Sequence, residues 1–120
     1  MQNNQIQTTD SILNSIKKYL GVDPEYTEFD DSIILATNTV LAALVQMGIG
    51  PQETGYAITG ATNVWSEFIE SDKKLNMIIT YVCMRVKLIF DPPQNSTLIN
   101  SMNEQIREFE WRAYTVKGNY

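Results

Sequence analysis

The segment over residues 72–90 constrains the fold most, because apolar residues cover most of its circumference. Two apolar rows run along it at intervals of three and four residues: Leu75, Ile79, Val82, Val86 and Ile89, and beside them Met77, Tyr81, Met84 and Leu88. This spacing predicts a helix. A helix that is apolar on most sides lies at the centre of its domain or is covered by a partner subunit. Arg85 and Lys87 interrupt the apolar run, which argues against a membrane span.

The end of this helix is set by four residues, Phe90, Asp91, Pro92 and Pro93. The two prolines supply no backbone N–H, and the residue before a proline avoids the α region. We therefore expect the helix to stop at Phe90 and a structural turn to follow.

Three further segments show helical spacing, at residues 9–20, 30–47 and from 95 or 96 to 114. Residue types that suit helix ends support these bounds. They are Asp10, Asp30, Asp31 and Asn95 or Ser96 at the amino-terminal ends, and Gly21 and Gly48 after the helices. The chain has 120 residues, which is one domain by length. The sequence thus predicts a single all-α domain over 1–120, a small bundle of four main helices with flexible ends at about 1–8 and 115–120.

Residues 48–64 differ in character, because four glycines and Pro51 mark a loop region between the second and third helices. Residues 56–59 form a possible short strand there, and a short helix at about 62–69 would carry Trp65 and Phe68. The glycines match neither a dinucleotide-binding fingerprint nor a phosphate-binding P-loop.

Most catalytic chemistry is excluded by two counts: the chain has no histidine and one cysteine, Cys83. Histidine-based acid/base catalysis, Ser-His-Asp and Cys-His sites, and zinc sites of histidine or paired cysteines all need residues that are missing. Cys83 lies among apolar residues and reads as a buried, inert thiol. We expect a non-enzyme without cofactor or metal, and a soluble, intracellular protein, because no disulfide, signal peptide or membrane span is indicated.

Acidic residues offer two weaker alternatives. Five of them lie together, Asp23, Glu25, Glu28, Asp30 and Asp31. A cation site is disfavoured because the spacing and central glycine of an EF-hand are missing, so helix capping and a solvated loop are preferred. Glu108 and Glu110 are a candidate carboxylate pair for catalysis, but they lie two positions apart on a helix and therefore do not face each other.

The net charge of −5 disfavours nucleic-acid binding, and it is unevenly placed. Residues 1–72 hold 10 acids and 2 bases, whereas residues 73–120 hold 4 acids and 7 bases. Two interpretations stay open: the halves meet head to tail between copies of the chain, or the charges interleave on one surface.

Trp111 falls on the polar side of the last helix, in the row of Asn100, Glu104 and Arg107. A large aromatic side chain on a polar face often marks a contact surface. The alternative is that another segment of the same chain covers it.

Taken in order, several motifs resemble the phage head-tail connector family, the adaptor or head-completion proteins of long-tailed phages and of prophages in Gram-positive bacteria. The matching segments are 29–34, Asn38, 44–51, 55–58, 65–68, 84–93 and 108–112, so the resemblance covers roughly residues 10–114. The most specific part is the Phe-Asp-Pro-Pro turn with the later Glu110-Trp111-Arg112.

The resemblance implies a structural virion protein of the phage neck, assembled in the host cytoplasm. Its subunits would form a ring, typically dodecameric, that docks on the portal protein and extends the DNA channel. The ring would offer a surface to the next stopper or tail-completion protein, while DNA passes without specific binding and no membrane is involved. No catalytic residue is implied. Our expected subunit or partner contacts are Gly50, Pro51, Tyr56, Ile58, Trp65, Trp111 and Arg112.

Three other interpretations of the function remain. The chain could be a small cytoplasmic helical protein that binds one regulatory partner. It could be an enzyme with a carboxylate-only site at Glu104, Glu108 and Glu110. A helix-turn-helix DNA binder is disfavoured by the acidic charge.

Overall fold

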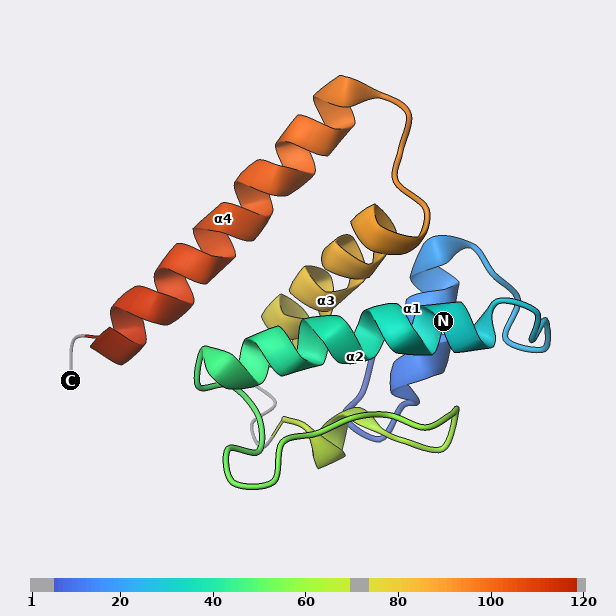
Figure 1. Ribbon diagram of the computed structural model, residues 1–120, viewed down its shortest axis with the longest axis horizontal. Coiled ribbons are helices and arrows are strands. Elements are labelled where there is room, and N and C mark those ends of the chain that lie inside the picture. Colours follow the sequence, from blue (N-terminus) through green and yellow to red (C-terminus); the bar gives the residue numbers. More distant parts are fainter. Residues whose placement is uncertain (1–5, 70–73, 119–120) are drawn as a thin grey trace, which may run out of the picture.

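Four α-helices form the protein in the computed structural model, which describes residues 6–69 and 74–118 (Figure 1). They are α1 (Ile12–Leu20), α2 (Asp30–Gln46), α3 (Leu75–Phe90) and α4 (Ser96–Gly118), with one 3₁₀ turn, η1 (Trp65–Glu67), before α3. The described part contains no strand; a single antiparallel bridge joins Ser11 and Val64. The predicted all-α fold with four main helices is confirmed.

Helix α3 is the centre of the bundle, because it packs against α1, α2 and α4. Both of its apolar rows contribute buried side chains, and Val82 and Val86 are fully inaccessible. Helix α4, in contrast, has extensive contacts with α3 only, and Figure 1 shows it lying along one side of the bundle. The composition of residues 72–90 thus correctly predicted a central helix.

Helix ends follow the local residues, with one correction at α1. Ser11, not Asp10, caps α1: its side chain accepts a hydrogen bond from the Asn14 N–H. The Asp10 carboxylate accepts from the Gln7 N–H instead. Gly21 follows α1 with a φ of 80°, the left-handed conformation that glycine favours, as predicted.

The ends of α3 and α4 also agree with the sequence. Helix α3 stops at Phe90, before Asp91 and the two prolines. The Asn95 side chain then accepts from the N–H groups of Thr97 and Leu98, which makes it the cap of α4. Helix α4 continues to Gly118, four residues beyond the predicted end, so the expected tail is largely helical; residues 1–5 and 119–120 lie outside the described residues.

The predicted strand over residues 56–59 does not form, because a side chain takes the place of a partner strand. The Asn38 amide, on α2, donates to the Ile58 carbonyl at 3.0 Å and accepts from the Ile58 N–H at 2.8 Å. The short helix predicted at 62–69 is reduced to the single turn η1.

Candidate interaction surfaces

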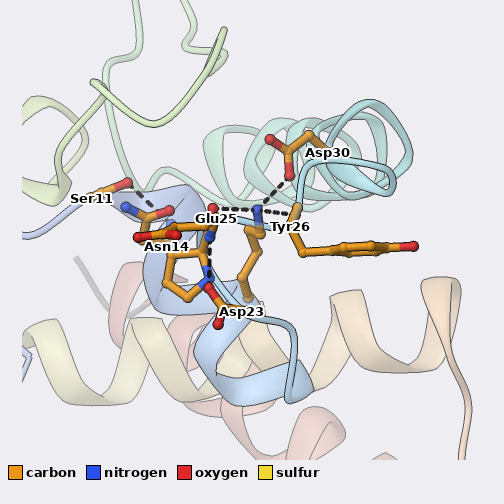
Figure 2. A network of polar contacts seen from close by, with 8 residues as sticks. Ser11, Asn14, Asp23, Glu25, Tyr26 and Asp30 are labelled. Carbon is orange, nitrogen blue, oxygen red and sulfur yellow. Dashed lines mark hydrogen bonds and ion pairs between the residues drawn. The ribbon is translucent and has the colours of Figure 1, made fainter.

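A buried lysine holds the acidic connector between α1 and α2, residues 22–29. The Lys17 ammonium donates to the carbonyls of Pro24 and Tyr26, at 3.0 and 2.7 Å, and to the Asp30 carboxylate at 2.7 Å. Figure 2 shows this network. The Lys17 side chain is 1% exposed and Asp30 25%. Asp30, expected to cap α2, instead neutralises Lys17, and α2 starts without a side-chain cap.

Sequence reasoning missed the role of Lys17, although a signal was present. Lys17 lies four residues after Leu13 and three before Leu20, so it falls on the apolar side of α1. A charged residue on an apolar face must be paired, because burying an unpaired ammonium is very costly. The acidic connector that follows α1 supplies the partner.

The connector presents aromatic rings next to its carboxylates. Tyr26 packs edge-on against Phe29, which packs edge-on against Phe90 at the end of α3, with centroids 5.4 and 5.5 Å apart. Tyr26 and Phe29 are nearly half exposed. Asp23, Glu25, Glu28 and Asp31 are exposed around them, and the described residues supply no ion-pair partner for these four. We call Tyr26, Phe29 and these four acids the aromatic–acidic knob.

A second cluster fastens α4 to α3. The Tyr81 hydroxyl donates to the Glu110 carboxylate at 2.7 Å, and Arg85 donates to the same oxygen at 3.0 Å. The Tyr81 ring stacks on Phe109 with centroids 4.3 Å apart. Burial, and then the bond to Glu110, raises the pKa of Tyr81. Tyr81 is therefore a neutral donor that holds the two helices in register.

Beside this cluster lies a groove of about 320 Å³ between the first half of α3 and the second half of α4. Tyr81, Met84 and Phe109 are its buried lining residues. Met77, which is 43% exposed, lines it from α3, and Arg112 lines it from α4. We call it the α3–α4 groove. Methionine and aromatic linings adapt to apolar side chains.

The structure separates the seven expected contact residues into two groups. Five lie in or near the 48–64 loop, where Ile58 and Trp65 are core residues and Gly50, Pro51 and Tyr56 are half-buried. The expectation that Ile58 and Trp65 contact a partner is thereby corrected, because their side chains are enclosed by the chain itself.

Hydrogen bonds explain why this loop is ordered without a partner. The Trp65 indole donates to the Ser15 hydroxyl at 3.1 Å, and Tyr56 donates to Glu67 at 2.6 Å. The bond from Asn63, and then that from Tyr56, lowers the pKa of Glu67. At Gly50, with a φ of 97°, any Cβ would lie only 2.5 Å from the Phe68 ring. Gly50 thus serves close packing, whereas a Cβ at Gly55 or Gly60 would meet nothing within 4 Å.

Trp111 and Arg112 form the second group, and both are exposed. Trp111 is 66% accessible, so none of the described segments covers it. Of the two interpretations of Trp111, the structure supports a free aromatic side chain on α4.

The charges do not interleave through ion pairs. Arg85, Lys87, Arg107 and Arg112 pair with acids from residues 91–110, and Lys17 pairs with Asp30. Among the described residues, no ion pair joins the acidic half of the chain to the basic half.

Three further features were considered as functional sites: the thiol of Cys83, a metal-binding group and a membrane-spanning helix. Cys83 is 2% exposed, and burial raises the pKa of its thiol to about 12, as expected for an inert cysteine. No group of three metal-ligating side chains occurs in residues 6–69 and 74–118. In the same ranges, no helix has the length and apolarity needed to cross a membrane.

Comparison with known proteins decides what this arrangement belongs to. A family model described as "Phage connector protein" matches residues 12–119, which span all four helices. The chain belongs to the phage connector proteins. This membership indicates a structural, non-enzymatic part of the virion neck. No curated protein and no solved structure matches the connector.

The motifs that suggested the family have structural tasks in this connector. Asn38 holds the 48–64 loop, Glu110 ties α4 to α3, and Phe90 packs on Phe29 across the start of α2. Trp111 differs from these three, because it has no such task among the described residues. Most of the resemblance therefore reflects the fold, and Trp111 is exposed on α4.

Proposed function

We propose that this connector forms a homo-oligomeric ring, of the dodecameric kind typical of the family, on the portal vertex of the capsid. The ring extends the DNA channel and gives the next stopper or tail-completion protein its attachment surface. It assembles in the host cytoplasm and remains in the virion neck. The observation that carries the proposal is the family match over residues 12–119, which includes every helix of the bundle.

The architecture is consistent with an assembly part. Helix α4 packs extensively on α3 alone and leaves Trp111 and Arg112 exposed, which gives a stable domain with a helix face free for contacts. The net charge of −5 suits a channel that repels phosphates, so that DNA slides through without specific binding.

Mixing purified connector with purified portal rings tests the proposal. We expect light scattering to give the mass of a multimer and electron microscopy to show a connector ring stacked on the portal ring. Phage particles produced without the connector gene should accumulate as separate heads and tails, and supplying the gene should restore joining. A connector that stays monomeric with portal rings, together with normal joining in its absence, would overturn the proposal. Binding to a host regulator instead would support the small partner-binding alternative.

A further inference from the structure

The connector carries two surfaces that complement each other but lie far apart on the same molecule. The aromatic–acidic knob lies at the α1–α2 turn and the start of α2, beside the end of α3 (Figures 1 and 2). The α3–α4 groove lies at the other end of the bundle, where α3 begins and α4 approaches its carboxyl end. A single copy therefore cannot fill its own groove with its own knob.

The shapes and polarities of the two surfaces match. The knob projects two half-exposed aromatic rings, Tyr26 and Phe29, while the groove is lined by Met77 and by the stacked rings of Tyr81 and Phe109. A volume of about 320 Å³ suits a few inserted side chains rather than a whole helix. Aromatic side chains that enter such pockets are typical anchors of protein interfaces.

The charges also match. Residues 22–31 hold five acids and no base, whereas residues 73–120 hold an excess of three bases. Lys74, just before α3, is exposed, and the groove is lined by one base, Arg112, and by one acid, Glu108. The only ion pair of Arg112 in the described residues is an exposed one with Glu108, which contributes little and can be exchanged for an acid on a neighbour.

The knob is held ready for binding. The Lys17 ammonium fixes the backbone of the acidic connector segment, residues 22–29, at Pro24 and Tyr26, and it also binds Asp30. In Figure 2 the Tyr26 ring extends away from this network. Because the loop is already ordered, binding does not incur the entropy cost of ordering it.

We propose that the aromatic–acidic knob of one copy inserts into the α3–α4 groove of the next copy. The contact is heterologous, since it joins two different surfaces, so each added copy offers a new free knob and a new free groove. Such contacts propagate head to tail and close into a ring when the rotation between copies allows it. This inference rests on the proposed ring-forming function and names the contact that builds the ring.

Cross-linking between two introduced cysteines tests the contact. Tyr26→Cys places a thiol on the knob and Met77→Cys places one at the groove; the native Cys83 is buried and serves as the unreactive background. With portal rings present, the double variant should give a ladder of cross-linked multimers. A mixture of the two single variants should stop at dimers, and each single variant alone should give none.

The alternatives give different products. Strong dimers from Tyr26→Cys alone would show a symmetric contact between two knobs and would overturn the inference. Rings that form on the portal without a Tyr26–Met77 cross-link would overturn this contact while leaving the proposed function intact. Absence of any multimer or portal complex would overturn both.

A matched pair of surface variants gives a second measurement. Phe29→Ser removes an exposed aromatic ring from the knob, and Leu35→Ser removes an apolar side chain that is 72% exposed on α2, outside the knob and the groove. If both variants melt cooperatively, Phe29→Ser should raise the concentration needed for assembly at least tenfold, and Leu35→Ser should leave it unchanged. Equal effects of the two, or an effect of Leu35→Ser alone, would contradict the proposed contact.

Discussion

The two long segments that flank α2 are both irregular, yet they are built in opposite ways. The 48–64 loop and the η1 turn that follows it fold inward, because Asn38 holds Ile58, and Trp65 and Phe68 enter the core. The acidic connector at 22–29 folds outward, because the Lys17 ammonium holds its carbonyls and leaves its side chains in solvent. Most of the expected contact residues lie in or next to the first segment, but the second segment is the one that projects.

This difference shows that composition is a weak guide to exposure. Glycines allow close approach of backbone and rings, as at Gly50 against Phe68, and so can mark tight packing as well as an open loop. Acidic residues favour solvent, but their backbone can still be fixed by one buried cation. Substitutions in and next to each segment should separate these two modes of folding.

Trp65→Ala should have the largest effect on the free energy of unfolding. Trp65 is fully buried and its indole donates to Ser15, so the loss should be about 4 kcal/mol. Urea unfolding followed by circular dichroism measures it. Trp111→Ala, on the exposed face of α4, is the matched control and should change stability by less than about 0.5 kcal/mol. Comparable losses for the two tryptophans would contradict the inward folding of the loop.

Lys17→Met should lower the free energy of unfolding by about 3 kcal/mol, because Asp30 and the carbonyls of Pro24 and Tyr26 lose their partner. Limited proteolysis should also show faster cleavage within residues 22–29. The neighbouring Lys18 is exposed, so Lys18→Met should change neither stability nor cleavage. If residues 22–29 stay protected from proteolysis in Lys17→Met, Lys17 is not the anchor of this segment.

Asn38→Ala should cost about 2 kcal/mol, since both backbone groups of the buried Ile58 lose their hydrogen bonds. Hydrogen exchange should become faster at residues 56–59, while the backbone amides of the acidic connector segment at 22–29 keep their protection. Thr39→Ala, at the exposed next position of α2, is the control. Faster exchange in both segments would mean that they are not independently held.

Glu67→Gln should give the smallest effect and appear mainly as altered pH dependence. The folded protein holds the pKa of Glu67 below its ordinary value of 4.5, through bonds from Asn63 and Tyr56. Its contribution is therefore present above pH 4.5 and is lost as pH falls through the lowered pKa. Thermal melting in acid should show a shallower decline for Glu67→Gln than for the native chain. An unchanged decline would remove Glu67 from the loop's stabilising network.

Much of the fold was predictable from local patterns. The spacing of apolar residues located all four helices and the central position of α3, and Gly21 and the Phe90-to-Pro93 turn located two of their ends. Neighbouring residues decide these features: side chains three and four apart share a helix face, and proline and glycine restrict or widen the local backbone.

The contact surfaces were predicted less well, as the two tryptophans illustrate. Both were expected to contact a partner; Trp65 lies in the core, whereas Trp111 is exposed. Trp111 was recognisable because it sits in a polar helical row. Trp65 had no such periodic context, and its burial depends on Ser15, fifty positions away.

Local sequence patterns are enough to show that this connector is all helical, where its helices lie, and that it lacks the histidines and paired cysteines of common catalytic and zinc sites. The packing of the helices, in contrast, establishes that Lys17 anchors the acidic connector segment, that Asn38 replaces a strand, and that the knob and the groove lie at opposite ends of the bundle. The difference comes from the range of the interactions. Helix formation depends on neighbours within one or two turns, whereas burial and pairing depend on residues that meet only when the helices pack.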